Sequence, residues 1–519
     1  MGRSGASAPL LHCVWLLFAS VRAEAPEKKP HIVVMLADNV GWAAVKWHQP
    51  PALSAEEITP KLDALRASGV ELDRHYTYKF CSPSRCSFLS GRLPAHANIY
   101  NDDPAMPGAG APVQFRLMPM MLRAAGYRTH FAGKWHVGMA SASTQPPLAR
   151  GFDTSLGYFH STNNYYDQRR AEGCGDAAYV DLWDGDGPSA LNGSAYEELV
   201  FRDRVVDVVR AHDASAPLFV YYALHTSCVG FDPEGTAGGE RDSLQPEATY
   251  YARFAAIDDH DRRANVAMVA LMDDVAGDVV AALEDQALWD STLFLWSSDN
   301  GGAVHLGGGS NTWPLRGGYY NNFEGGVRAP AFLAGGALPP AARGRKLTEW
   351  IYIADWYATF ARLAGVAADD GAVPAVDSLD VWDAIAGNAT SPRVEWVQTP
   401  LQENATRAMH GGDACLFSKP YKLLVGAVRQ NGWPGQVHPN TTVAWDSFAD
   451  VLDCAAGCLF DVGADPEERH DLAAAMPDKV AELRAKLEGA AFYDPDRGEP
   501  DPRACAAANR TGYWAPFLP

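Results

Sequence analysis

Four apolar stretches of the sequence end abruptly in side chains that can bind a cation, ionise or transfer a proton. The stretch His31–Ala37 runs into Asp38 and Asn39. The other three endings are Asp299 and Asn300 after Leu293–Trp296, His225 after Leu218–Leu224, and Lys134 and His136 after Tyr127–Ala132. A single polar ending is ordinary for the start of a loop, whereas four endings of this chemistry predict one shared site.

A cysteine-centred stretch adds a candidate nucleophile. It reads Cys81-Ser-Pro-Ser-Arg85-Cys-Ser-Phe-Leu-Ser-Gly91-Arg92. Pro83 suits the start of a helix, which would place residue 81 near the positive end of the helix dipole. That end, together with Arg85, favours an anionic substrate and an ionised nucleophile. A half-buried loop cysteine would explain Cys81 but not the ordered set around it.

This stretch closely resembles the signature of the sulfatase family, Cys-x-Pro-Ser-Arg followed by Leu-x-Gly-Arg. In that family a formylglycine-generating enzyme oxidises the cysteine to formylglycine, an aldehyde. The hydrated aldehyde carries two hydroxyls: one attacks sulfur, and the other later loses its proton, expels sulfate and restores the aldehyde. A serine could perform only the first half of this cycle.

The resemblance covers nearly the whole chain after its first residues. Blocks in family order are Thr59–Leu65, Gly133–His136, Arg150–Asp153, Leu224–Thr226, Ser298–Gly302, Pro314–Gly317 and Glu324–Arg328. Near the C-terminus, Leu459–Asp461, Asp465–Leu472 and Asp501–Arg503 resemble the arylsulfatase B (N-acetylgalactosamine-4-sulfatase) branch. The resemblance implies an alkaline-phosphatase-like fold with a small C-terminal domain.

Roles at the site follow from the resemblance position by position. Asp38, Asn39, Asp299 and Asn300 match calcium ligands, and the cation would also hold residue 81. Oxygen donors of this kind suit a hard divalent cation. Lys134 and His225 match groups that bind sulfate and protonate the leaving oxygen. Arg85 and His136 match groups that orient the formylglycine hydrate, with His136 as the expected base for the elimination step.

Two positions depart from the family pattern. Asn39 stands where relatives usually have Asp, and Tyr319 stands where they usually have Lys. The two changes in formal charge cancel, which predicts a compensated pair. If instead the loop before Glu324 is shifted in register, Arg316 is the nearest cation that could replace the lysine.

The elements that must position these residues alternate between strands and helices. Helices are expected from Thr59–Pro60 to Gly69, from Met118 to Ala125 and from Ala264 to Leu283. Strand and helix in alternation predict an α/β fold, a large and mostly parallel sheet flanked by helices. Short strands and a helix near Pro477–Leu487 predict a smaller α+β domain. The expected organisation is a signal peptide over 1–23, a catalytic domain over 24–395 and a C-terminal domain over 396–519.

The beginning of the chain resembles a secretory signal. Arg3 precedes the apolar stretch Leu10–Ala19, and Val21-Arg22-Ala23 is a candidate cleavage site. No later run is long and apolar enough to span a membrane. The sequons Asn192, Asn388, Asn404, Asn440 and Asn509 support export as a glycoprotein. A secreted or lysosomal-type compartment is expected. Disulfides are expected among the cysteines that follow the signal peptide, Cys454 and Cys458 included.

Composition excludes some classes of protein. The 519 residues are 47% hydrophobic with a net charge of −20, so neither wholesale disorder nor a nucleic-acid binder is expected. The leading interpretation is a sulfatase that hydrolyses sulfate esters; the branch resemblance favours a sulfated carbohydrate over a steroid, and the expected partner is a sulfated carbohydrate or aryl sulfate substrate. Two alternatives are a catalytically weak or silent binder of sulfated glycans and a phosphohydrolase of the same superfamily. The sequence leaves open the sugar and its linkage, exo or endo action, and the oligomeric state.

Overall fold

In the computed structural model, a ten-stranded sheet forms the centre of the protein. The structure describes residues 1–2, 28–54, 56–101, 103–231, 242–304, 307–401, 413–439 and 451–519. The predicted signal peptide and the sequons Asn404 and Asn440 therefore lie largely or wholly outside the described residues. In sheet order the strands are β15 (Arg345–Leu347), β2 (Val70–Leu72), β14 (Ala331–Ala334), β13 (Thr292–Ser298), β1 (His31–Ala37), β10 (Leu218–Ala223), β4 (Arg128–Lys134), β5 (Thr154–Tyr158), β8 (Trp183–Asp184) and β9 (Gly187–Pro188).

The middle of this sheet is parallel, as the sequence predicts. Strands β13, β1, β10, β4 and β5 all run in one direction. Antiparallel strands flank them, since β14 pairs antiparallel with β13 and β8 pairs antiparallel with β5. The carboxyl ends of the parallel strands therefore lie at one edge, which is where α/β proteins place their sites.

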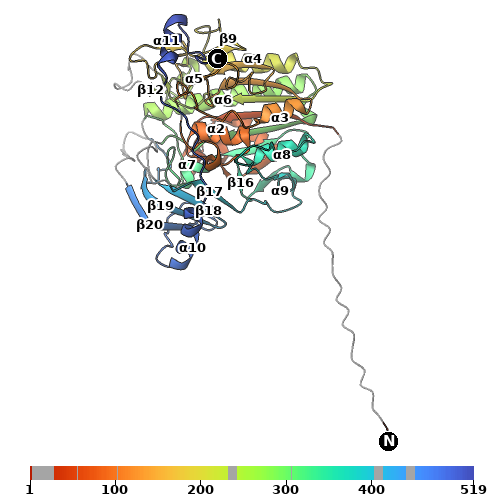
Figure 1. Ribbon diagram of the computed structural model, residues 1–519, viewed down its shortest axis with the longest axis vertical. Coiled ribbons are helices and arrows are strands. Elements are labelled where there is room, and N and C mark those ends of the chain that lie inside the picture. Colours follow the sequence, from red (N-terminus) through yellow and green to blue (C-terminus); the bar gives the residue numbers. More distant parts are fainter. Residues whose placement is uncertain are drawn as a thin grey trace.

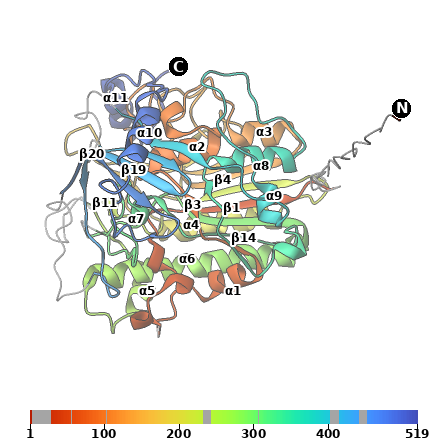
Figure 2. The same ribbon diagram turned by 90° about the horizontal axis from the view of Figure 1, so that it is seen from below.

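Helices cover both faces of the sheet (Figure 2). One layer holds α1 (Pro60–Ser68), α4 (Glu197–Arg210), α5 (Ala248–Arg253) and α6 (His260–Asp285), and the other holds α2 (Cys81–Ser90), α3 (Met118–Ala124), α8 (Asp355–Leu363) and α9 (Trp382–Ala386). Successive residues of β1 pack into different cores: Val34 lies in the core beneath α2 and α8, and Val33 lies in the core beneath α4 and α6. A strand buried on both faces explains why its sequence is continuously apolar.

A second, antiparallel sheet follows the large one along the chain. It contains β17 (Glu395–Thr399), β18 (Ala414–Ser418), β19 (Tyr421–Arg429) and β20 (Val451–Asp461), and α10 (Pro477–Glu488) packs against it. Figure 1 shows this small sheet and α10 at the lower end of the molecule. The remaining short elements are β3 (His75–Tyr76), β6 (Arg169–Arg170), β7 (Tyr179–Val180), β11 (Gly230–Phe231), β12 (Asp242–Ser243), α7 (Glu324–Val327), β16 (Ile351–Tyr352) and α11 (Pro502–Thr511).

The last thirty residues return to the large sheet. Helix α11 lies at the upper end of the molecule in Figure 1, and a disulfide joins Cys505 on α11 to Cys174. The Trp514 indole N–H donates to the carbonyl of Arg170 at 2.8 Å. These residues therefore pack with the larger part of the protein, and the division at residue 395 into two domains stays a prediction.

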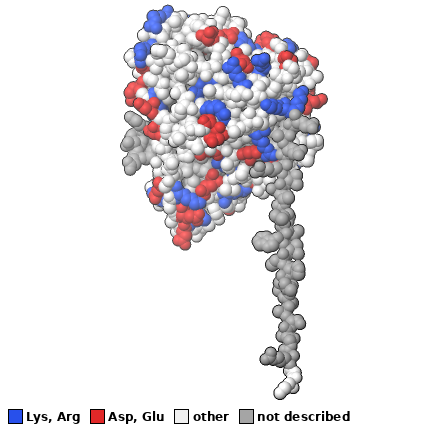
Figure 3. All heavy atoms as spheres, turned by 45° about the vertical axis from the view of Figure 1, so that its right-hand side comes forward, with Lys and Arg blue, Asp and Glu red and all other residues white. Residues whose placement is uncertain are grey.

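Cysteines fall into two groups. Cys174–Cys505 and Cys454–Cys458 are disulfides, which confirms the expectation of disulfide bonding. Cys81, Cys86, Cys228 and Cys415 are buried and lie outside these disulfides. On the face drawn in Figure 3, acidic and basic side chains are interspersed. Among the described residues, the helices are too short or too polar to cross a bilayer.

Candidate active site

The candidate nucleophile lies at the first residue of a buried helix. Helix α2 begins at Cys81, has Pro83 in its first turn and ends at Gly91, whose left-handed φ of 69° suits glycine. Every residue from Cys81 to Ser90 is buried. The helix therefore presents its positive end to the interior, next to the carboxyl edge of the large sheet.

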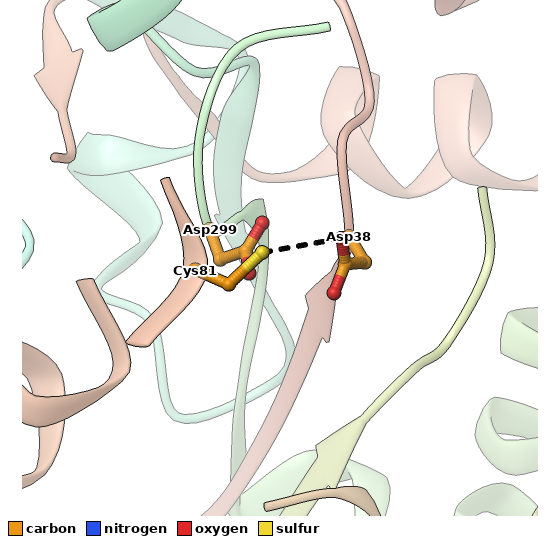
Figure 4. Close-up of side chains that lie close together, drawn as sticks. All are labelled: Asp38, Cys81 and Asp299. Carbon is orange, nitrogen blue, oxygen red and sulfur yellow. Dashed lines mark hydrogen bonds between the residues drawn. The ribbon is translucent and has the colours of Figure 1, made fainter. Parts of the chain in front are cut away.

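Two carboxylates face Cys81 from adjacent strands (Figure 4). Asp38 and Asp299 follow β1 and β13, which pair in register through Ala37 and Ser298. Cys81 Sγ lies 3.7 Å from Asp38 Oδ1. One ligand atom from each of Asp38, Cys81 and Asp299 lies within 4.8 Å of the other two. Pairing of the two strands therefore brings together Asp38 and Asp299, which are more than 250 positions apart in the sequence.

Two basic side chains balance these carboxylates. Arg85 donates to Asp38 Oδ2 and to Asp299 Oδ2, each at 3.0 Å. Lys134 Nζ lies 2.5 Å from Asp38 Oδ2. All four side chains are fully buried. Two anions and two cations together keep the formal charge near zero, which is how buried charges are tolerated.

Burial shifts the ionisation of the anionic groups. Burial and then the charge of Asp38 raise the pKa of the Cys81 thiol from 9.0 to about 12. Burial and then Asp38 also raise the pKa of Asp299 from 3.8 to about 6. An unmodified Cys81 is therefore a neutral thiol at neutral pH and a poor nucleophile, because the thiolate is the reactive form.

The two asparagines complete an oxygen-rich cluster that suits a cation. Asn300 Nδ2 donates to Asn39 Oδ1 at 2.6 Å, while Asn300 Oδ1 is buried with no hydrogen-bond partner among the described residues. A buried carbonyl oxygen without a partner is costly, and a cation would satisfy it. Carboxylate and amide oxygens on Asp38, Asn39, Asp299 and Asn300 form the ligand type that Ca²⁺ prefers.

Strand β4 and the residues directly after it supply Lys134 and His136, which were also predicted from the sequence. Gly133 has φ 102°, and a side chain there would collide with the carbonyl of Ala223. This close approach brings Lys134 to Asp38. His136, two residues later, is buried with a left-handed φ of 50°. The structure thus brings Lys134 to the cluster, and the role of His136 as a base stays a prediction.

His225 is placed differently from the other predicted residues. Its Nδ1 lies 2.8 Å from Glu197 Oε2, and its Nε2 lies 2.8 Å from Thr162 Oγ1. The ring of Tyr165 stacks on it at 3.9 Å. Both ring nitrogens therefore already have protein partners in this structure. The role of His225 in binding sulfate stays a prediction.

A pocket of about 120 Å³ opens beside Cys81. Its lining residues are Asn39, Cys81, Asn101, Lys134, Ser161, Thr162, Cys228, Val229, Ala303, Gly308, Tyr319 and Tyr320. Sequence reasoning missed most of these, since Thr162, Cys228 and Tyr320 lie in loops without a motif of their own. The one signal was that Cys228 follows closely on a predicted strand ending.

Tyr319 occupies the position inferred from the family spacing. Its hydroxyl lies 3.5 Å from Cys81 Sγ. Arg316 points elsewhere: it contacts Asn431 and the carbonyl of Glu468 and stacks on Phe323 at 4.2 Å. Arg316 is therefore not a replacement for the missing lysine in this structure.

The chain is similar to known proteins over most of its length. The sequence model of the Sulfatase family matches residues 30–366. Arylsulfatase J of Mus musculus is 30% identical over 513 residues, covering 95% of this chain and 81% of the relative. Arylsulfatase A of Homo sapiens is 26% identical over 524 residues, covering 93% and 94%. N-acetylgalactosamine-6-sulfatase of Canis lupus familiaris is 26% identical over 501 residues, covering 90% and 86%.

Solved structures agree in fold. The crystal structure of Ps i-CgsB in complex with k-i-k-neocarrahexaose has a TM-score of 0.70 at 23% identity, covering 93% of this chain and 99% of that one. The PsFucS1 sulfatase from Pseudoalteromonas sp. has a TM-score of 0.64 at 22% identity, covering 89% and 90%. The family prediction and the alkaline-phosphatase-like fold are confirmed, while the arylsulfatase B branch is only loosely indicated. The chain belongs to the sulfatase family of sulfuric ester hydrolases.

Proposed function

We propose that this sulfatase cleaves sulfate esters through residue 81 after Cys81 has been oxidised to formylglycine, with Ca²⁺ bound beside it. One observation carries the proposal: Cys81 begins the buried helix α2 and lies against Asp38 and Asp299 at the carboxyl edge of the sheet. A helix N-terminus and a cation both favour an anionic group such as sulfate.

The chemistry of residue 81 supports the modification, because an unmodified cysteine has no second hydroxyl on the same carbon with which to release sulfate. The hydrated aldehyde supplies two hydroxyls on one carbon, one for attack and one for release of sulfate. The chain would meet a formylglycine-generating enzyme during maturation, in a secreted or lysosomal-type compartment.

Four oxygen donors would hold the cation. Asp38 and Asp299 supply charge, and Asn39 and Asn300 supply amide oxygens, one of which is buried without a partner among the described residues. Arg85 bridges the two aspartates and thereby orients them. Bound Ca²⁺ would supply Lewis acidity toward a sulfate oxygen and toward residue 81.

Lys134 and His136 have the predicted roles in this proposal. Lys134 lines the pocket and would bind a sulfate oxygen, and His136 would take the proton in the elimination step. His225 is assigned a positioning role instead, because its ring joins Glu197 to the pocket residue Thr162. This assignment differs from the direct sulfate contact expected from the sequence.

Two substrate classes are supported by the relatives. The name of N-acetylgalactosamine-6-sulfatase supports the sulfated carbohydrate that the sequence favoured, and the names of arylsulfatases A and J support an aryl sulfate. Sulfated carbohydrates and aryl sulfates differ in the acidity of the hydroxyl group that is released from sulfur. The walls of the pocket can select between substrates that differ in this property.

The test is the intact mass of the peptide across Cys81, measured with sulfatase activity on the same preparation. Formylglycine would make the peptide about 18 Da lighter than the cysteine form. Cys81→Ser should lose turnover, and Cys415→Ala, which changes a buried free thiol in the small sheet, should retain it. Full activity with an unmodified thiol throughout would overturn the proposal.

A further inference from the structure

A cavity of about 490 Å³ lies at the edge of the large sheet opposite Cys81. Its lining residues include Pro30, directly before β1, and Leu293 in the first turn of chain of β13. Asp38 and Asp299 follow the other ends of these two strands. Each strand has seven residues, so about 23 Å of strand separates this cavity from the candidate active site.

This cavity has an apolar interior and a polar mouth. We call it the α9 cavity, lined by Lys28, Asp290, Leu293, Leu363 and, on helix α9, Trp382. The three apolar residues of this set are 1%, 2% and 5% exposed in that order, whereas Lys28 and Asp290 are exposed. Protein sites that hold a small ligand combine apolar walls with a few polar groups at volumes of about 300–1,000 Å³. The α9 cavity has the size and lining of such a site.

Trp382 brings a hydrogen-bond donor without an acceptor to the α9 cavity. Its backbone N–H donates to Asp380 Oδ1 at 3.0 Å. Its indole N–H has no acceptor among the residues that the structure describes. A nearly buried donor that lacks an acceptor costs free energy. A ligand with a carbonyl or hydroxyl oxygen would satisfy this indole.

Asn388 lines the same cavity from just beyond the end of α9. The helix ends at Gly387 with a left-handed φ of 86°, and the Asn388 backbone N–H donates to the carbonyl of Asp383 at 2.8 Å. The side-chain amide of Asn388 is exposed and forms no hydrogen bond within the described ranges. The backbone of Asn388 is therefore fixed, while its amide nitrogen is open to a new bond at the cavity.

The sequence makes Asn388 an acceptor for a glycan. Asn388–Thr390 reads Asn-Ala-Thr, the pattern to which N-linked glycans are attached. At two other sequons the asparagine oxygen already has a protein partner: Asn509 Oδ1 accepts from Tyr179 at 2.5 Å, and Asn192 Oδ1 accepts from Tyr513 at 3.3 Å. Among the sequons in the described part of the chain, Asn388 alone combines an unbonded side chain with an adjoining cavity.

The chemistry of an N-linked glycan matches the α9 cavity. Asn388 Nδ2 loses one proton and forms a bond to C1 of N-acetylglucosamine, which leaves the diphosphate of a lipid-linked oligosaccharide. The first two N-acetylglucosamine units together have the size of the ligands that such cavities hold. Their acetamide carbonyls and hydroxyls accept hydrogen bonds, as the Trp382 indole requires, and their acetyl methyl groups suit the apolar walls.

We propose that Asn388 carries an N-linked glycan whose first two N-acetylglucosamine units fill the α9 cavity. The glycan is then a structural part of the fold, at the edge of the sheet opposite the candidate active site. The competing occupant is the segment Glu24–Glu27, which precedes Lys28 in the chain. The glycan is favoured because two of those four residues are glutamates, whose burial against apolar walls is costly.

The first experiment measures how well the glycan at Asn388 is protected. The full chain is secreted from a host that adds high-mannose glycans and is treated with endoglycosidase H, which cleaves between the first two N-acetylglucosamine units. In the native protein, peptide mass spectrometry should show cleavage at Asn388 at least about tenfold slower than at the other occupied sequons, and equal rates after denaturation. An unoccupied Asn388, or equal rates in the native protein, would overturn the inference.

The second experiment removes the glycan but keeps the asparagine. Thr390→Ala destroys the sequon and should lower the Tm by about 1–3 °C relative to the glycosylated wild type. Ser194→Ala, which destroys the sequon at Asn192, is the matched control and should leave the Tm unchanged. If Thr390→Ala is as stable as the glycosylated wild type, the glycan is not part of the fold.

The third experiment removes the indole donor. Trp382→Phe should speed native cleavage at Asn388 by about three- to tenfold, because the glycan loses one hydrogen bond in the cavity. Trp47→Phe is the control, since the Trp47 indole N–H is also buried without a partner among the described residues but lies outside the α9 cavity. Cleavage in folded Trp382→Phe at the wild-type rate would count against the inference.

A deletion separates the two occupants. A variant in which the signal peptide is joined directly to Lys28 lacks residues 24–27 and should keep the protection of the glycan at Asn388. If the deletion lowers the Tm as much as Thr390→Ala does, and the glycan at Asn388 is cleaved as fast as the others, the segment fills the cavity and the inference fails. These measurements need no turnover, so their outcome is independent of the proposed function.

Discussion

Glu197 and His225 form a buried pair in which Glu197 Oε2 lies 2.8 Å from His225 Nδ1. Thr162 has one hydroxyl proton, which it donates to the carbonyl of Val229, so His225 Nε2 must donate to Thr162 Oγ1. Burial raises the pKa of Glu197 well above its usual value and lowers the pKa of His225 well below its own. Both shifts favour a neutral pair, in which the Glu197 carboxyl donates to Nδ1.

The first prediction concerns this pair. Glu197→Gln should be tolerated, with a loss of at most about 1 kcal/mol of unfolding free energy, because the Gln amide can donate to Nδ1 while its oxygen accepts from Asn163. Glu197→Ala should lose about 3 kcal/mol, since it leaves a buried acceptor and a donor unpaired. Urea denaturation measures both variants. A loss for Gln equal to that for Ala would show that the pair is charged.

The second prediction concerns the cation. Asp299→Asn should weaken Ca²⁺ binding at least about tenfold, because it removes one of two charged ligands. Binding is measured by titration calorimetry, which does not depend on turnover. The control is Glu71→Gln in a second cluster, His48, Glu71 and Asp73, where Lys346 and Arg328 already neutralise the carboxylates. Equal affinities of wild type and Asp299→Asn would remove Asp299 from the ligand set.

The third prediction concerns the two departures from the family pattern. Asn39 and Tyr319 both line the pocket, so the effects of changing them should couple. Asn39→Asp should lower kcat/KM, because it adds an anion that no lysine balances. Adding Tyr319→Lys should restore activity beyond additivity by about 0.5–3 kcal/mol in a double-mutant cycle. Strictly additive effects would show that the two positions vary independently.

The fourth prediction concerns pH and the contact between helix α7 and the small sheet. Glu468 lies 2.6 Å from Lys422 Nζ, and Lys422 also contacts Glu324 at 3.0 Å, all of them buried. Burial is the main cause that raises the pKa of Glu468 from 4.5 to about 7. The folded protein thus holds this proton to higher pH than the unfolded chain does. The stability from Glu468 is complete below about pH 4.5 and is lost as pH rises through about 7.

Glu468→Gln removes this dependence. The unfolding free energy of the variant, relative to wild type, should therefore rise between pH 4.5 and 7, by up to about 3 kcal/mol. Thermal or urea denaturation across that range measures the difference. Glu467→Gln, which changes the neighbouring and more exposed carboxylate, is the control. A constant difference between Glu468→Gln and wild type across the range would contradict the assignment.

The strand endings could be predicted because the relevant signals are local. Each apolar stretch is a strand buried on both faces, so its composition alone reveals it. Asp38 and Asp299 follow β1 and β13 directly, and parallel neighbours place their carboxyl ends together. The Cys81 stretch was equally local, because its residues occupy a single helix.

The contacts between side chains that are distant in the sequence could not be predicted. Glu197 begins α4 and looks in sequence like an ordinary acidic first turn, yet it binds His225 on another element. Cys228 and Tyr320 lie in loops without a motif, and they meet at the pocket only after the sheet has formed. The final helix α11 gave no sign that it would return to Cys174.

The Cys81 stretch, the two carboxylates beside it and the strands that carry them could be identified from the amino-acid sequence, because each depends on neighbours a few residues away. The partners of the ring nitrogens of His225 and the side chains that line the pocket beside Cys81 became apparent from the folded structure alone. Those contacts join residues dozens to hundreds of positions apart, and their hydrogen bonds and ring contacts depend on distances of a few tenths of an ångström that no local pattern encodes.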